Sequence, residues 1–157
     1  MKTEIQHKID KINIMLENAM LKLNFMIVSG KVKSLIQLGE GLVSLDSDKY
    51  TNGGFWLWDY IANEIFYSPL FCTSLGFEYG ELGNGFGGFD RGNAAQLKAG
   101  MDQIKNLVET KSLEIFTNFI DFRKKDNTIL KVECRGEVLF LNNKPYVILG
   151  THRILEL

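Results

Sequence analysis

The sequence predicts an α+β fold: a five-stranded antiparallel sheet with helices on one face, preceded by N-terminal helices. Three observations support this prediction. Apolar residues recur at steps of three and four over the first part of the chain, which is typical of an amphipathic helix. Beyond residue 53 the expected elements follow in the order strand, strand, short helix, long helix and three strands. That order is typical of an antiparallel sheet with its helices on one side.

Residues 1–46 are predicted to form a helical, coiled-coil-like dimerisation segment. Apolar residues fall at the alternating steps of four and three that mark the a and d positions of a coiled coil, namely Ile5, Ile9, Ile12, Leu16, Ala19, Leu23 and Met26. From residue 14 onward the other faces are apolar too, so this helix is expected to pack on a second surface as well. Ser29 and Gly30 predict a break before a second amphipathic stripe. The alternative is helix packing within one chain, without a dimer.

A polar, turn-rich stretch at 46–54 marks the boundary with a second domain, expected at 53–155. Aromatic residues predict a short strand at 55–59. A turn and a second strand at 65–68 follow, so the second domain is expected to begin with a hairpin.

The middle of this domain is expected to be helical. Pro69 begins a short helix that Gly76 ends. A glycine-rich loop at 80–92 leads to apolar residues at helical spacing, which predict a long helix at 94–108.

The last part of the chain reads as strands at 113–123, 129–141 and 146–154. In the middle one, small and apolar residues alternate with charged ones: Val132, Cys134, Gly136 and Val138 against Lys131, Glu133, Arg135 and Glu137. This alternation predicts a strand with one buried face and one face in water.

Composition excludes several classes of protein. The 157-residue chain has a net charge of -1 and lacks the basic stripe of a nucleic-acid binder. Two cysteines without metal-ligand spacing indicate a reducing compartment, and we expect a cytoplasmic protein with no signal peptide or membrane span. No nucleophile is paired with a base, so we expect no enzyme.

The chain from about residue 53 to 155 resembles the PAS family of sensory domains. Residues 54–59, Gly-Phe-Trp-Leu-Trp-Asp, are similar to the G-x-W-x-W-D start of the first strand in one subgroup. Residues 75–82 resemble the family's L-G-Y…E-L stretch, and 122–127 resemble its R-x-x-x-D-G turn. Two motifs differ: the H-P-D-D segment is missing, and Thr-His-Arg-Ile replaces the usual D-I-T ending. The resemblance therefore implies output through the N-terminal helices, or an effector such as a histidine kinase or cyclase domain.

The resemblance also implies a pocket between the sheet and the helices. The positions carried over from flavin-binding relatives are Trp56, Trp58, Phe66, Val132, Cys134, Ile148, Gly150 and His152. The two tryptophans are suited to covering a small ligand. The alternative is that they fill the cavity themselves.

The cofactor stays unknown. Covalent flavin chemistry is argued against, because residues 83–90 contain no cysteine where the light-sensing relatives carry one. Haem ligation from the long helix is argued against, because residues 94–110 contain no histidine. The two histidines lie at opposite ends of the chain, so no metal site is predicted. Residues 83–88 match G-x-G-x-x-G, but no parallel βαβ unit surrounds them.

Two functions remain open from the sequence. The first is a signal-input module that binds a small ligand or a partner and transmits through helical packing in a homodimer. The second is a ligand-free interaction module that holds two chains together.

Overall fold

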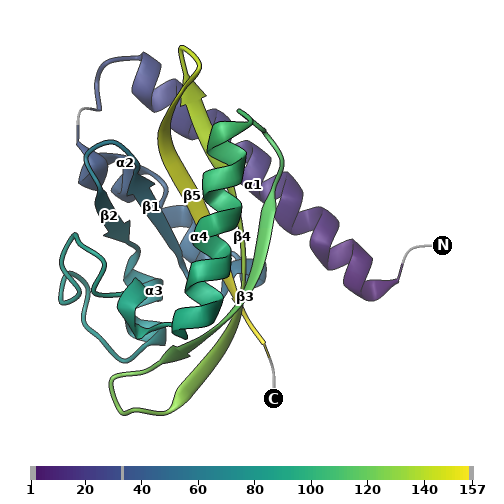
Figure 1. The fold of residues 1–157 in the computed structure, drawn as a ribbon, viewed down its shortest axis with the longest axis vertical. Coiled ribbons are helices and arrows are strands. Elements are labelled where there is room, and N and C mark those ends of the chain that lie inside the picture. Colours follow the sequence, from purple (N-terminus) through teal and green to yellow (C-terminus); the bar gives the residue numbers. More distant parts are fainter. Residues whose placement is uncertain (1–2, 33, 156–157) are drawn as a thin grey trace.

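The computed structural model, which describes residues 3–32 and 34–155, is built around a five-stranded antiparallel sheet with the strand order β2-β1-β5-β4-β3 (Figure 1). The strands are β1 (Phe55–Asp59), β2 (Glu64–Tyr67), β3 (Phe116–Arg123), β4 (Ile129–Leu141) and β5 (Lys144–Ile154). The predicted fold class is confirmed. The bounds of β1 and β4 are those expected from the sequence, whereas β3 begins three residues later than predicted.

Asparagines in left-handed backbone conformations make the turns between strands. Asn142 and Asn143 have φ angles of 52° and 63° and join β4 to β5. Two positive φ angles in a two-residue loop match the right-handed twist of an antiparallel hairpin. Asn63 (φ 59°) and Asn127 (φ 69°) lie in the turns before β2 and β4. Each turn sets which residues of its two strands are paired, and therefore which side chains point to each face of the sheet.

The inner face of the sheet is covered by α3 (Pro69–Ser74), the short turn η3 (Phe89–Arg91) and α4 (Ala94–Glu109), and α4 lies in front of the sheet in Figure 1. The Ser68 hydroxyl accepts a hydrogen bond from the Phe71 amide at 3.2 Å, and Pro69 occupies the first turn of α3. Asn93 caps α4 in the same way through Gln96. Capping residues and proline thus start both helices where the sequence predicts them.

The outer face is covered by the N-terminal helices, with α1 (Glu4–Val28) lying behind the sheet in Figure 1. The chain continues through α2 (Leu35–Gly41), η1 (Val43–Ser47) and η2 (Lys49–Thr51). The predicted break after α1 is confirmed: Ser29 caps the helix, and Gly30 has a φ of 71°. The apolar face of α1 shares the outer core with Phe55, Leu57, Val147 and Leu149, and the main contact of α1 with the sheet is with β4.

The expectation that one face of β4 lies in water is confirmed only for Lys131, because Glu133, Arg135 and Glu137 on the same face are buried or half-buried. Glu133, on that face, is only 5% exposed. The physical reason is that α1 crosses this side of the sheet, with Asn13 within reach of Arg135. A charged face can be covered in this way because its charges are paired with one another, as described below.

Strand β1 belongs to both cores. Trp56 and Trp58 are buried in the inner core, whereas Phe55 and Leu57 are buried in the outer core. Successive side chains of a strand point to opposite faces, so the five residues of β1 join the inner core to the outer core, whereas β4 is the strand that contacts both α4 and α1.

Candidate functional site

The inner face brings together most of the residues predicted to line a pocket. The pairing of β1 with β5 places Trp56 opposite Gly150 and Trp58 opposite Ile148. The pairing of β4 with β5 places Cys134 opposite His152. Val132 belongs to the same inner core. Seven of the eight candidates therefore lie on one face of the sheet.

Phe66 is the exception, and its predicted place in this pocket is wrong. It lies opposite Leu57 in the pairing of β1 with β2, and directly paired residues share a face. Leu57 faces the outer core, so Phe66 does too. There the ring packs on Gly39 of α2, where an added Cβ would lie 2.2 Å from Phe66 Cδ1. Ile65 and Tyr67 are the residues of β2 that face inward.

Two facing glycines make room for the aromatic side chains of the pocket. Gly136 and Gly150 are paired across β4 and β5. A Cβ at Gly150 would lie 2.2 Å from Trp56 Cζ2, and one at Gly136 would lie 2.5 Å from Phe116 Cζ. The rings of Trp56 and Phe116 therefore lie against bare backbone, with centroids 6.4 Å apart.

His152 is a buried neutral acceptor. Trp56 Nε1 donates a hydrogen bond to His152 Nε2 at 3.1 Å, and the imidazole is 2% exposed. Burial lowers the pKa of His152 to about 3. The ring centroid lies 5.2 Å from that of Phe71 and 5.4 Å from that of Phe122. A neutral imidazole with Nε2 as acceptor carries its proton on Nδ1.

The space left in this pocket is small. The cavity beside Trp56, His152 and Cys134 has a volume of about 30 Å³. Ligand pockets for small molecules usually measure about 300–1,000 Å³. This cavity is closer to the size of one water molecule, which occupies roughly 30 Å³ in the liquid. The arrangement matches the alternative in which aromatic side chains fill the cavity themselves.

The sequence did not identify Tyr67 as a residue of this site. Its hydroxyl donates to the Gly85 carbonyl at 2.6 Å and accepts from the amide of Gly88 at 3.2 Å. Burial raises the pKa of Tyr67 to about 12, so the hydroxyl keeps its proton. One phenol thus ties the glycine-rich loop to the sheet. The inward position of Tyr67 in β2 is the signal that sequence reasoning missed, because it assigned the neighbouring Phe66 to that face.

The seven residues of the predicted dimer seam differ in how far they are exposed for contact with a second chain. Ile12, Leu16, Ala19 and Leu23 are buried in the chain's own outer core. Ile9 and Met26 are half-buried, and Ile5 is exposed. The alternative of helix packing within one chain therefore describes the four central residues.

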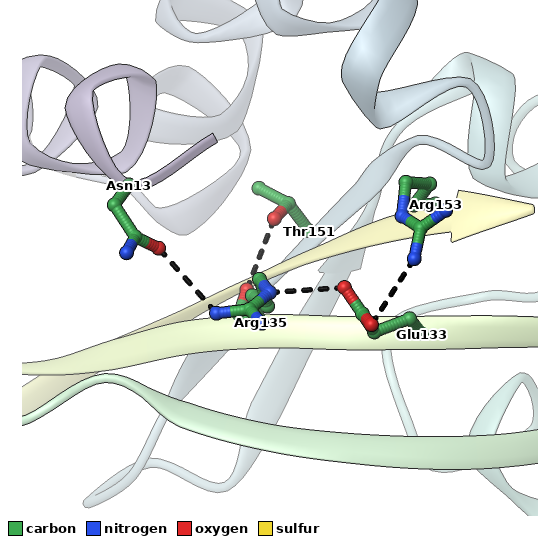
Figure 2. A network of polar contacts seen from close by, with 5 residues as sticks. All are labelled: Asn13, Glu133, Arg135, Thr151 and Arg153. Atoms are coloured by element: carbon green, nitrogen blue, oxygen red, sulfur yellow. Dashed lines mark hydrogen bonds and ion pairs between the residues drawn. The ribbon is translucent and has the colours of Figure 1, made fainter. Parts of the chain in front are cut away.

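A buried ion network lies where α1 crosses the sheet (Figure 2). Glu133 Oε1 accepts from Arg135 Nε at 2.9 Å, and Glu133 Oε2 accepts from Arg153 Nη2 at 3.1 Å. Thr151 Oγ1 donates to the Arg135 carbonyl at 3.0 Å, and the Arg135 side chain reaches Asn13 of α1. One carboxylate thus serves two guanidinium groups, which leaves the network with one positive charge in excess.

The described residues contain no other obvious chemical centre. Within residues 3–32 and 34–155, no group of three His, Cys, Asp or Glu side chains is arranged to hold a metal ion. Burial raises the pKa of the Cys134 thiol to about 12 and that of Cys72 in the same direction, so neither is an activated nucleophile. None of the helices in these ranges has the length and apolar character that crossing a bilayer requires.

Comparison with known proteins identifies the fold through solved structures of low sequence identity. No protein-family model matches the sequence, and no curated protein matches it significantly. Among solved structures, a sensory box histidine kinase/response regulator from Burkholderia thailandensis superposes with a TM-score of 0.58 at 17% identity, over 71% of this chain and 84% of that one. The PAS-B domain of Drosophila melanogaster Cycle, with bound ethylene glycol, has a TM-score of 0.53 at 17% identity, over 65% and 99%.

The chain has the PAS fold. The N-terminal domain of a diguanylate cyclase with a PAS/PAC sensor from Marinobacter aquaeolei agrees, with a TM-score of 0.53 at 10% identity over 64% of this chain and 92% of that one. The resemblance to PAS domains inferred from the sequence is thus confirmed at the level of the fold. The narrower resemblance to the subgroup with the G-x-W-x-W-D strand stays a prediction.

Proposed function

We propose that this chain is a signalling module of the PAS type that acts through protein contacts of α1, with a second copy of the chain as the partner. The observation that carries the proposal is the double role of β4, which contacts α4 on one side of the sheet and α1 on the other. A change in the packing of the inner face can reach α1 through this one strand. Output through the N-terminal helices is one of the two alternatives that the altered C-terminal motif of the sequence left open.

The partner surface on α1 differs from the seam predicted from the sequence. Ile14, Leu21, Phe25 and Val28, which we call the outer stripe, are each at least 58% exposed. They follow one another at steps of seven, four and three residues, the spacing of coiled-coil positions. An apolar stripe of this kind is self-complementary, so two copies can bury it in one symmetric interface.

The matching test uses Leu21→Asp, with Leu113→Asp as its control. Both residues are exposed leucines, and Leu113 lies outside α1. We expect the wild-type chain to be a dimer by light scattering and native mass spectrometry, Leu21→Asp to be a folded monomer, and Leu113→Asp to remain a dimer. A monomeric wild type at high concentration, or a dimer that survives Leu21→Asp, would contradict the proposal.

A second candidate function is a small-ligand sensor of the inner pocket. Its support is His152, a neutral imidazole buried beside Trp56 at a position that matches a ligand contact in related domains. The small cavity counts against it. Native mass spectrometry with an absorbance spectrum of the same sample decides between the two: extra small-molecule mass supports the sensor, and bare colourless chains support the interaction module.

A further inference from the structure

A cleft of about 570 Å³ lies on the outer side of the molecule, away from the inner pocket. Its walls come from the first turns of α1, from η2 and from the last residues of β5. The side chains that give it its character are Lys8, Lys11, Lys49, Arg153, Tyr50 and Glu4. The volume is within the range of small-molecule sites, about 300–1,000 Å³.

The charge of the cleft is opposite to that of the chain. In the part of the chain that the structure describes, four side chains that are cationic at neutral pH line it against a single carboxylate, that of Glu4, while the whole chain has a net charge of -1. Among the described residues, Lys8, Lys11 and Lys49 take part in no ion pair. Unpaired cations gathered on one concave surface raise the local concentration of anions.

Tyr50 holds two of these cations close together. Lys11 Nζ lies 5.6 Å and Lys49 Nζ 5.1 Å from the centroid of its ring. The Lys11 ammonium beside the hydroxyl lowers the pKa of Tyr50. The position of Tyr50 is fixed by Asp48, whose Oδ1 accepts from the Tyr50 amide at 2.8 Å. Cation–π contact of this kind keeps ammonium groups in place without neutralising them.

Arg153 is held at the opposite wall by the ion network of Figure 2. Because Glu133 is shared with Arg135, the charge of Arg153 is only partly compensated. Its side chain is 29% exposed and engages Glu133 through Nη2, and its Nε is buried without a partner, so an anion in the cleft would bind the remaining N–H groups of the guanidinium. Asn52 Oδ1 accepts from the Ile154 amide at 2.7 Å, which leaves the NH₂ group of that side chain as another donor in the cleft.

We propose that this cleft binds a small organic anion with at least two negative charges, of the class of phosphorylated metabolites. The site joins α1, η2 and β5, so a bound anion would add contacts between the N-terminal helix and the end of the sheet. The inference goes beyond the proposed function, because it requires neither a dimer nor an open inner pocket.

The test is calorimetric titration of the full chain with pyrophosphate and with ATP, in low salt at neutral pH without divalent metal. We expect saturable binding with one site per chain, weakening as salt is added. Lys49→Glu is expected to weaken binding by about tenfold or more, since it replaces an attractive charge by a repulsive one beside the anion. Lys105→Glu on the exposed face of α4 makes the same change in net charge away from the cleft, and should alter binding by less than about twofold.

Three results would overturn or reassign the proposal. Absence of saturable binding of both probes overturns the proposal, and so does an equal loss in Lys49→Glu and Lys105→Glu, which would indicate diffuse attraction. Tighter binding of a poly-uridine oligonucleotide than of ATP would assign the cleft to nucleic acid instead. The oligomeric state of Lys49→Glu is measured in parallel: a dimer that no longer binds pyrophosphate supports the anion site whatever becomes of the helix-packing proposal.

Discussion

The two faces of the sheet differ in how they are closed. The inner face is closed by aromatic rings, with Trp56 packed edge-on against Phe89 at a centroid distance of 4.9 Å and nearly parallel to Phe116. The outer face is closed by the N-terminal helices, of which α1 meets both an apolar core and a buried ion network. The comparison teaches that the face where PAS domains are expected to hold a ligand is nearly full here. The outer face, by contrast, has an apolar stripe and a cationic cleft open to solvent.

The largest expected effect is that of Leu16→Asp. Leu16 is fully buried in the outer core, so the variant places an unpaired charge among apolar side chains. We expect the free energy of unfolding to fall by more than about 4 kcal/mol, enough to leave much of the protein unfolded. Circular dichroism and urea denaturation measure it.

The matched control for Leu16→Asp is Leu21→Asp on the opposite face of the same helix. Leu21 is exposed, so the stability of the single chain should change by no more than about 0.5 kcal/mol. Equal stability of the two variants would mean that α1 does not pack on the sheet as described.

Trp56→Ala tests the inner face. The ring is 3% exposed and fills the space above Gly150, so its removal leaves a cavity. We expect a loss of about 3–5 kcal/mol in the free energy of unfolding. Indole added to the variant should recover part of the loss in a urea titration, because a dry apolar cavity binds apolar molecules. A loss below about 1 kcal/mol would show that the ring is not packed as described.

A pH-dependent effect, absent at neutral pH, is expected from His152. Its pKa is about 3 in the folded chain against an ordinary 6.5. Between these two pH values the unfolded chain binds a proton that the folded chain does not, so acid destabilises the fold. The contribution is about 1.4 kcal/mol for each pH unit below 6.5 and vanishes above it.

Urea titrations over this pH range measure the effect in the wild type and in His152→Gln, which keeps an acceptor for Trp56 Nε1. The variant should lose this part of the acid dependence. His7→Gln, at an exposed histidine of α1, should retain it. A wild-type slope in His152→Gln would contradict the assignment of His152 as a buried neutral group.

Much of the sheet was predictable because local chemistry fixes it. Patterns among neighbouring residues predicted the strands β1 and β4 and the turns at asparagine, and the structure has these elements where they were expected. The seam of α1 was predicted as a dimer contact, and its four central residues are buried in the chain's own core. What the seam packs on was not predictable, because a heptad pattern is satisfied equally by a partner helix and by a sheet.

The residues of the candidate site were predictable only in part, because the sequence does not set the pairing register of the short strand β2. In a four-residue strand, one step decides whether Phe66 or Tyr67 faces the pocket, and only the pairing with β1 sets that step. The burial of Glu133 and the gathering of Lys8, Lys49 and Arg153 depend on elements far apart in the sequence. No short-range pattern records such contacts.

The packing of α1 has a consequence for biosynthesis. The helix lies near the beginning of this sequence, but the strand residues that cover it, Val147 and Leu149, come near the end. Leu38, Leu42 and Leu45 can cover part of its apolar face early in translation, but the part that packs with β4 and β5 stays uncovered until those strands have been synthesised. Contacts of such long sequence separation slow folding and leave the nascent chain prone to aggregation. A chaperone that shields an amphipathic helix during synthesis would therefore be expected to raise the yield of this protein.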